Sequence, residues 1–355
     1  MFALFIVELP SLRAQSIQVV SSLHALAERG RRVRLWFRPT GGDPLAPYGL
    51  APHPNLELCA LPASRTLGSL VFRADLARWA SEHRGTGVFL ARSKRYARFA
   101  TRVAPHVPLV LEAHEVDSLQ HARTDGMRFA ALERVVLDRA AGLITNCEGV
   151  LEGLSWMHRL PPVTRVVHNA WLPGPDTPAS GSGLALAGSL LGTKDPTTVA
   201  RAARRLGPIT VYGPEDPRFP GLVAESRSRP DGPCPPALVR GGPVDPKDLV
   251  DTLRRHEILI LPLGRGWFGD AFTSPLKAFA YQAARVPFVG ADTPALRRAA
   301  PGAFEPYEPG DVDGLVEAVE SLRDPAVRAR RLAASTPRTW AQRAAEVDEV
   351  LDAVG

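Results

Sequence analysis

The chain has 355 residues, its hydrophobic content is 45% and its formal net charge is +6. This length predicts two domains, because a domain usually holds roughly 100–200 residues. The only cysteines, Cys59, Cys147 and Cys234, have no paired spacing, which argues against a zinc ribbon or a disulfide scaffold and favours a reducing, cytoplasmic setting.

The first half of the chain alternates short apolar runs with amphipathic segments. The opening run, 2–9, is too short to span a bilayer and follows no basic segment, so we interpret it as a strand. Further strands are expected at 32–38, 56–61, 87–91, 107–113, 142–146 and 164–170. Helices are expected at 16–30, which ends at Gly30, and at 126–141. Because each helix is long enough for a right-handed crossover, this order is typical of a parallel sheet covered on both faces.

Positive charge is concentrated in the first half. Residues 1–172 hold 21 Lys and Arg against 14 Asp and Glu, a balance of +7, whereas the remainder holds 22 against 23, a balance of −1. The densest run is ARSKRYARFATR, 91–102. As a helix it could lie on an anionic membrane surface or meet a phosphorylated acceptor, and a solvated helix face is the alternative. No nucleic-acid partner is expected, because no helix-turn-helix, zinc or aromatic RNA-binding signature accompanies the charge.

A segment rich in Pro, Gly and Ser, 171–183, precedes a second series of strands and helices. Its composition and lack of apolar periodicity predict an interdomain linker. Strands then follow at 184–188, 208–213, 237–242, 257–263 and 286–290, with helices at 195–207, 245–256, 311–324, 336–354 and after 273. The fold class is therefore α/β, with doubly wound domains at 1–171 and 184–336 and a linker at 172–183.

Two loops of the second half carry a lysine where a helix begins. In LAGSLLGTKDP, Lys194 precedes the helix, and in TSPLK, Lys277 lies in its first turn. The second helix start also offers two capping side chains and a proline suited to the first helical position: Thr273, Ser274 and Pro275. A cation at a helix N-terminus costs roughly 0.3–1 kcal/mol unless an anion offsets it, and a lysine that points into solvent is the alternative. Because ligands bind at the carboxyl ends of such strands, both lysines could meet one diphosphate.

The order of these segments resembles the GT-B nucleotide-sugar glycosyltransferases, in particular the retaining GT4 group. SIQVVSSLHALAERGRRVRL resembles the first helix and second strand of that family, VLEAHEVD its acceptor-domain histidine segment, and AAGLITNCEGV the strand before its hinge. VVHNAW resembles the turn into the linker, LAGSLLGTKDP the first donor-domain loop and SPLKAFAYQAARVPFV the donor-binding helix. The resemblance covers nearly the whole chain. It implies two Rossmann-like domains that face a cleft, with the last helix, 337–355, packing back on the N-terminal domain.

The resemblance implies donor-binding residues position by position. Lys194 matches a lysine that contacts the donor diphosphate, and Ser189 follows the loop glycine, Gly188, where the family usually has an arginine. The segment 274–277 matches the one whose amides, hydroxyl and ammonium hold the distal phosphate. The expected donor-binding residues are Gly188, Ser189, Lys194, Gly213, Arg240, Val244, Asp270, Thr273, Ser274, Pro275, Leu276 and Lys277.

On the acceptor side, His114 matches a family histidine near the sugar and the reaction centre, and an ordinary histidine at a strand end is the alternative. The N-terminal loop reads LRAQS in place of the family's glycine pair. Arg13 in that loop could meet a phosphate or an acidic acceptor, or lie at the surface. The expected acceptor-side residues are Arg13, Gln15, Ser16 and His114, and the expected catalytic residues are His114, Lys194 and Lys277.

Two departures from the family concern carboxylates. The family commonly carries two glutamates around the donor-binding helix, one for the sugar and one for the ribose, and this chain has Phe272 and Ala280 in their places. Neither side chain can accept a hydrogen bond. We expect Asp270 to contact the sugar hydroxyls instead, whereas no ribose partner is evident. Arg240 and Val244 are the residues expected near the base.

These residues predict a hexosyltransferase-type enzyme that moves a sugar from a nucleotide-diphosphate sugar to a hydroxyl on a glycan, lipid or small molecule, with retention. The two lysines and helix N-termini would stabilise the departing diphosphate, and the phosphate would itself deprotonate the acceptor with His114 assisting. No cofactor and no metal are expected, since no DxD pair or cluster of metal ligands is visible. The basic first half predicts a cytoplasmic protein that is peripheral on the inner face of a membrane.

Three other functions compete with this prediction. A non-catalytic scaffold is the main alternative, because the two family glutamates are missing. A nicotinamide oxidoreductase would need a glycine fingerprint after the first strand, which is absent. A sugar epimerase would need carboxylates for proton abstraction that the sequence does not place. The base, the sugar, the acceptor and the oligomeric state are not predicted.

Overall fold

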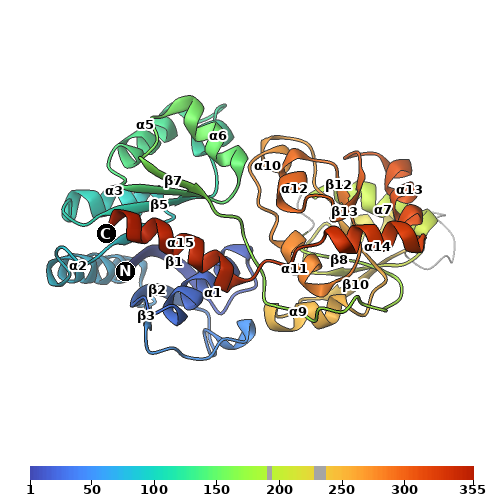
Figure 1. Cartoon of the computed structure of the whole chain (residues 1–355), viewed down its shortest axis with the longest axis horizontal. Helices are drawn as coiled ribbons and strands as arrows, with labels where there is room; N and C mark the ends of the chain where they lie inside the picture. The colour runs from blue at the N-terminus through green and yellow to red at the C-terminus, as the bar shows by residue number, and fades with distance from the viewer. Residues whose placement is uncertain (190–193, 228–236) are drawn as a thin grey trace. The chain divides into compact units, whose positions relative to one another are not determined.

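A computed structural model describes residues 1–189, 194–227 and 237–355 of the chain. The described residues form two compact units (Figure 1). The first comprises Met1–His168 and Trp340–Gly355, and the second comprises Asn169–Thr339. The last helix of the chain therefore belongs to the first unit. Cys234 lies outside the described residues.

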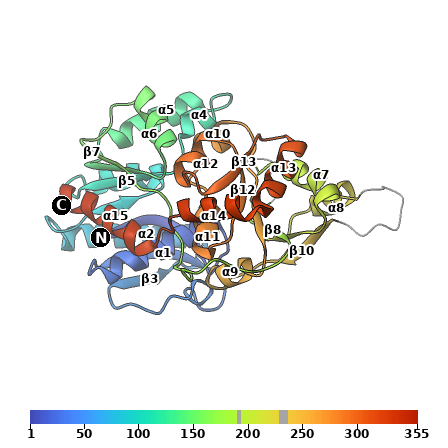
Figure 2. The same ribbon diagram turned by 45° about the vertical axis from the view of Figure 1, so that its right-hand side comes forward.

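The first unit is built on one parallel sheet, whose seven described strands have the order β3-β2-β1-β4-β5-β6-β7. These strands are β1 (Phe2–Leu9), β2 (Val33–Pro39), β3 (Leu56–Ala60), β4 (Phe89–Ala91), β5 (Leu109–Ala113), β6 (Gly142–Thr145) and β7 (Val163–Val166). The described helices are α1 (Ala14–Glu28), η1 (Ala46–Tyr48), α2 (Arg65–Glu82), α3 (Lys94–Val103), α4 (Asp117–Gln120), α5 (Gly126–Leu137), α6 (Glu148–Met157) and α15 (Trp340–Val354). Helix α15 lies beside α1 in both ribbon views (Figures 1 and 2).

The second unit repeats this plan with a six-stranded parallel sheet among its described residues, in the order β10-β9-β8-β11-β12-β13. Its strands are β8 (Leu184–Ala187), β9 (Ile209–Tyr212), β10 (Leu238–Gly242), β11 (Ile258–Leu261), β12 (Phe288–Ala291) and β13 (Phe304–Tyr307). Its described helices are α7 (Pro196–Leu206), α8 (Phe219–Glu225), α9 (Pro246–Leu253), α10 (Trp267–Asp270), α11 (Leu276–Ala284), α12 (Pro294–Ala299), α13 (Val312–Arg323) and α14 (Pro325–Ala334). The predicted α/β fold class with two doubly wound sheets is confirmed.

Apolar strands build both cores because helices cover the two faces of each sheet. Every residue of β5, β8 and β11 is buried. Several elements were not predicted, and two of them, α2 and β13, carry a weak sequence signal. Helix α2 has few regularly spaced apolar residues and contains Gly68, and β13 is a four-residue strand that contains Pro306.

The boundaries of the two units fall close to the predicted linker. Residues 172–183 form no helix or strand, and they belong to the second unit. These residues pack closely against that unit. A Cβ added to Gly174 would lie 2.1 Å from the carbonyl oxygen of Ala283, and a Cβ added to Gly181 would lie 2.1 Å from the carbonyl carbon of Arg255. This segment is therefore packed against the unit rather than extended in solvent.

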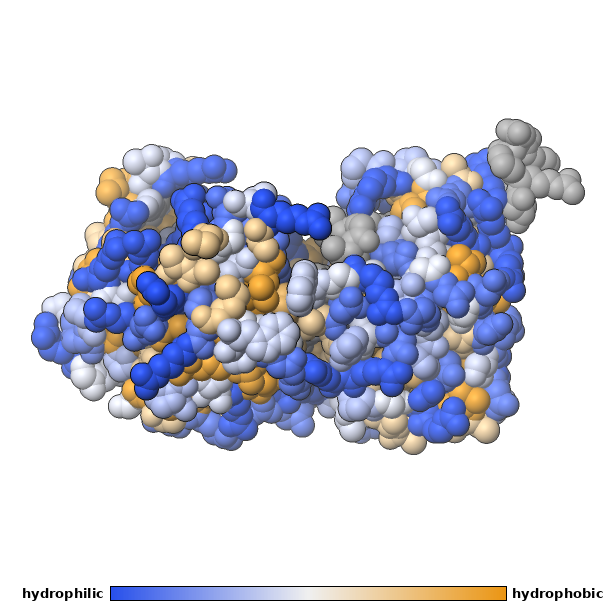
Figure 3. Space-filling model, turned by 90° about the horizontal axis from the view of Figure 1, so that it is seen from above, coloured by the Kyte–Doolittle hydropathy of each residue, from blue (hydrophilic) through white to orange (hydrophobic). Residues whose placement is uncertain are grey.

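Hydrophilic residues cover much of the surface seen from above in the space-filling view (Figure 3). Hydrophobic patches interrupt them on the side of the first unit that carries α5 and α6. Among the helices of the described residues, none combines the length and the apolar character that crossing a bilayer requires.

Candidate functional site

Three neighbouring strands of the second unit end at a glycine or are directly followed by one. The N–H of Gly188 donates to the carbonyl oxygen of Tyr212 at 2.8 Å, and the N–H of Gly213 donates to that of Gly242 at 2.9 Å. Gly188 has a φ of +135°, a conformation that favours glycine. A Cβ on Gly213 would lie 2.3 Å from the carbonyl oxygen of Gly188. The carboxyl ends of β8, β9 and β10 thus approach one another without side chains between them.

Replacing Gly213 by alanine should therefore destabilise the second unit, by about 1–3 kcal/mol, because the added methyl group overlaps a backbone oxygen. Urea unfolding measures this change. Gly221→Ala in α8 is the matched control, because nothing lies within 4 Å of a Cβ there. Alanine also favours helix more than glycine, so the control should be unchanged or slightly more stable. Equal stability of both variants would contradict the close packing of these loops.

The two predicted lysines lie in the second unit, where α7 and α11 begin. Both side chains are half-buried. Burial lowers the pKa of Lys194 to about 8. Burial, and then the charge of Lys194, lowers the pKa of Lys277 to about 8 as well. The ammonium of Lys277 lies 4.9 Å from the ring centre of Trp171, a cation–π contact. The structure thus brings these two cations together, whereas residues 190–193 of the predicted phosphate loop lie outside the described residues.

The affinity of this site for a nucleoside diphosphate should fall as the pH rises above about 8. Both lysines are cationic below that pH and lose their protons as the pH passes it, whereas an ordinary lysine stays charged to about 10.5. A bound anion favours the charged form, so binding must take up a proton above pH 8. We expect affinity for UDP to weaken at least about tenfold between pH 7 and pH 9.5. Calorimetric titrations across this range measure it, and a constant affinity would contradict the role of the lysines.

The start of α11 differs from the prediction in its capping. Pro275 is the N-cap rather than the first helical residue, and no side chain caps the helix. Neither Thr273 nor Ser274 serves as the cap that was predicted. Ser274 is instead tied to Asn169, whose N–H donates to the Ser274 hydroxyl at 3.1 Å and whose side-chain amide donates to the Ser274 carbonyl oxygen at 2.8 Å. Because this contact uses the hydroxyl oxygen as an acceptor, the hydroxyl can still donate its own hydrogen.

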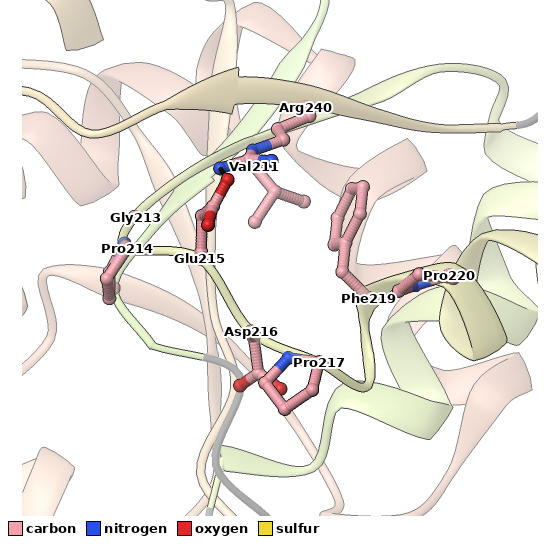
Figure 4. Close-up of a pocket in the computed structure, with 10 residues that line it drawn as sticks. Val211, Gly213, Pro214, Glu215, Asp216, Pro217, Phe219, Pro220 and Arg240 are labelled. Carbon is pink, nitrogen blue, oxygen red and sulfur yellow. Dashed lines mark hydrogen bonds and ion pairs between the residues drawn. The ribbon is translucent and has the colours of Figure 1, made fainter.

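A pocket of about 360 Å³ opens beside the strand-end glycines (Figure 4). Its lining residues are Gly188, Val211, Gly213, Pro214, Glu215, Asp216, Pro217, Phe219, Pro220 and Arg240. Arg240 lies in β10 rather than in a loop, and it donates to Glu215 at 2.9 Å. Val244 is half-buried in the segment after β10 and does not line the pocket. The lining of the pocket includes an aromatic ring, two carboxylates and a guanidinium.

Asp270 is the last residue of α10, and neighbouring residues hold its side chain. Its carboxylate accepts from the N–H of Gly266 at 2.9 Å and from Arg265 at 3.3 Å, and Arg265 also pairs with Glu308. Phe272 is buried and stacks on Trp267 with ring centres 5.5 Å apart. The carboxylate of Asp270 is therefore engaged by residues close to it in the sequence. Ser189 is half-buried in the loop that follows β8.

In the first unit, His114 follows β5 and contacts a buried glutamate. Its Nε2 lies 2.7 Å from Oε1 of Glu112, which also accepts from Gln18 at 2.7 Å and from Arg343 of α15 at 2.6 Å. Arg92 donates to Gln18 at 2.9 Å. Glu112 and Arg343 are almost inaccessible to solvent. The histidine is thus one member of a buried polar network.

The network sets the protonation of both groups. Burial alone would raise the pKa of Glu112, but Arg343, His114 and Arg92 outweigh it and hold that pKa well below its usual range. Burial, followed by the charge of Arg92, lowers the pKa of His114 to about 4. At neutral pH the histidine is therefore uncharged. Because Glu112 is ionised and only accepts, Nε2 carries the hydrogen and Nδ1 keeps a lone pair.

The other acceptor-side residues lie around the start of α1. Arg13 is its N-cap and pairs with Glu8 at 2.9 Å, and its side chain is largely exposed. Gln15 is exposed, whereas the Ser16 hydroxyl donates to the carbonyl oxygen of Glu8 at 3.0 Å. The Ser16 hydroxyl is therefore committed to the backbone of β1.

Sequence reasoning missed the residues that surround His114: Gln18, Arg92, Glu112 and Arg343. The one available signal was Glu112, an acidic residue inside an apolar run that reads as a buried strand. A buried carboxylate requires a partner. The partner, Arg343, lies 231 residues away and has no pattern that marks it.

Residues 15–170 match a family model described as "Glycosyl transferase 4-like domain". The match covers less than half of the chain, and over these residues the chain is similar to that domain. The resemblance to the GT-B glycosyltransferases of the GT4 group is thereby confirmed. No curated protein sequence matches the chain.

Solved structures share the fold over nearly the full length. HepE of Anabaena, crystallised with UDP and glucose, is 13% identical with a TM-score of 0.70, and the match covers 98% of each chain. WaaG, a glycosyltransferase involved in lipopolysaccharide biosynthesis, is 15% identical with a TM-score of 0.63 over 100% of this chain and 96% of its own. A putative UDP-N-acetylglucosamine 2-epimerase of Listeria monocytogenes is 12% identical with a TM-score of 0.61 over 98% and 95%. The fold is GT-B, and proteins described as a glycosyltransferase and as a putative epimerase share it.

Proposed function

We propose that the chain transfers a sugar from a nucleotide-diphosphate sugar to a hydroxyl acceptor, with retention and without a metal. The observation that carries this proposal is the pair of lysines, Lys194 and Lys277, whose pKa values burial lowers to about 8 at the starts of two helices. Two desolvated cations repel each other, and a bound diphosphate removes the cost. A UDP-sugar is the first donor to test, since HepE was crystallised with UDP-glucose.

The lysines act on the leaving group. As the bond between the sugar and the diphosphate breaks, negative charge grows on the phosphate oxygens. Lys194, Lys277 and the Ser274 hydroxyl stabilise that charge, together with the backbone amides where α11 begins. Because these groups supply fixed positive charge, the proposed reaction requires no metal. Among the described residues, no group of three or more His, Cys, Asp or Glu side chains is placed to hold one.

The departing phosphate takes the proton of the acceptor hydroxyl on the face of the sugar that it leaves, which gives retention. His114 assists by position rather than as a general acid, because its pKa of about 4 keeps it neutral. Its free Nδ1 lone pair can accept a hydrogen bond from a sugar or acceptor hydroxyl. We also propose that the acceptor is a glycan, a lipid or a small molecule. The protein would bind peripherally to an anionic membrane surface.

A donor screen tests the proposal. The chain is incubated with UDP-, GDP-, ADP- and dTDP-sugars, and release of the nucleoside diphosphate is followed with and without hydroxyl acceptors. We expect one donor to be hydrolysed slowly, and the anomeric configuration of its product to match the donor. Calorimetry with the four nucleoside diphosphates separates this function from a non-catalytic scaffold, for which none of them would bind. Sugar inversion at C2 without nucleotide release would instead indicate an epimerase.

A further inference from the structure

A second pocket, of about 330 Å³, lies in the first unit between α3 and α5. Its lining residues are Arg95, Arg98, Phe99, Arg102, Arg128, Phe129 and Leu132. Arg95, Arg98 and Arg102 are three and four residues apart, so they share one face of α3. Arg128 reaches the pocket from the first turn of α5. Four guanidinium groups therefore surround one hollow.

None of these four arginines has a carboxylate within 4.0 Å among the residues that the structure describes. Many of the chain's other arginines are paired with an acidic residue, as Arg31, Arg34 and Arg218 are. An unpaired cluster of like charges is unfavourable unless an anion is present. The arrangement therefore indicates an external anionic ligand.

The one acidic residue within α3 and α5 faces inward. Helix α3 contains no acidic residue, and Glu133 is the only one in α5. Glu133 is fully buried and binds Lys94 at 2.9 Å, and Asp117 binds the same lysine at 3.0 Å. Lys94 is accordingly buried and neutralised, so the basic run at 91–102 does not form one exposed face. Lys94 pairs with Glu133 and Asp117 away from the pocket. The arginines are therefore the exposed charges of this run.

The floor of the pocket is apolar. Phe99, Phe129 and Leu132 are half-buried there. The guanidinium of Arg73 lies 4.9 Å from the ring centre of Phe99, and His121 stacks on Phe129 with ring centres 4.6 Å apart. Such a pocket suits a ligand that carries an anionic group beside an apolar part. Hydrophobic patches bordered by hydrophilic residues are visible on the α5 side of this unit (Figure 3).

We propose that this pocket, formed by α3 and α5, binds the phosphate group of a phosphorylated ligand whose adjoining part is apolar. Arginine suits this role because its planar fork donates two parallel hydrogen bonds to phosphate oxygens. The site goes beyond the proposed transfer reaction, since the two lysines of the donor site lie in the other unit. A lipid phosphate and a soluble phosphate ester present the same chemistry, and both are included in the test.

Calorimetric titration of the full chain with phenyl phosphate, inorganic phosphate and dihexanoyl phosphatidic acid tests the site. Saturating UDP keeps these probes out of the donor site, and the Lys277→Ala chain serves the same purpose if UDP does not bind. The test variant is Arg98→Gln with Arg102→Gln. The matched control is Arg134→Gln with Arg139→Gln, which removes the same charge from exposed positions outside the pocket.

We expect one saturable site for phenyl phosphate, weakened at least tenfold in the test variant and less than twofold in the control, with unchanged UDP binding. Tighter binding of the short lipid, and competition from vesicles that contain phosphatidic acid, would assign the ligand to a lipid. Phenyl phosphate binding without such competition would assign it to a soluble ester. The proposal fails if no probe binds saturably, or if both double variants lose binding equally, as general surface charge would produce.

Discussion

Replacing Lys277 by alanine should lower nucleotide-sugar turnover at least about a hundredfold, and about a thousandfold if the ammonium acts mainly in the transition state. The side chain is half-buried, its pKa is lowered to about 8, and it lies at the start of α11 beside a second lysine. Burial therefore makes the charged form of Lys277 unfavourable when no anion is bound, and a bound anion would offset that cost. Loss of this charge removes stabilisation that grows as the phosphate departs, so kcat should fall more than the affinity for donor.

Steady-state release of UDP, or of the diphosphate that the donor screen identifies, measures this effect. Lys277→Met keeps an unbranched side chain of similar length but has no ammonium to place over the Trp171 ring, and it should be equally inactive, which separates charge from side-chain volume. Lys247→Ala removes an exposed lysine that pairs with Asp248, and it should retain full activity. Both Lys277 variants should be as stable as the parent chain or more so, because a desolvated charge is lost. Near-normal turnover in either would overturn the proposed function.

Replacing Arg343 by methionine should destabilise the first unit by about 3–5 kcal/mol, the usual cost of leaving a buried charge without its partner. Arg343 is fully buried and donates to Oε1 of Glu112 at 2.6 Å, and it also donates to the Ser22 hydroxyl. Methionine has a similar length and fills most of the space. The loss is therefore mainly electrostatic and leaves an ionised carboxylate in the core.

Urea unfolding followed by tryptophan fluorescence measures the change. The double variant Arg343→Met with Glu112→Gln should recover a large part of the stability, because neither charge is then left alone. Arg330→Met changes an exposed arginine of α14 and should have an effect within about 0.5 kcal/mol. A double variant as unstable as the sum of the two single ones would show that the two residues act independently.

The alternation of strands and helices could be predicted from the sequence, because parallel strands that are buried on both faces are continuous apolar runs. The runs at 109–113, 184–187 and 258–261 are of this kind, and each is a strand. Elements without such a run escaped prediction, as β13 did with its proline. Lys194 and Lys277 were also found from sequence, because a cation at a helix start is locally unfavourable and so indicates an anion.

The sequence by itself thus determined the α/β class, the two sheets and the candidate phosphate lysines, since these depend on patterns only a few residues long. The tertiary structure alone decided which charges are buried and what they meet. It turned Lys94 inward to Glu133, left Arg98 and Arg102 around a pocket, and joined Glu112 to Arg343 across 231 residues. Such pairs form because a buried charge must find a partner, and only the folded chain determines which distant residue lies within reach.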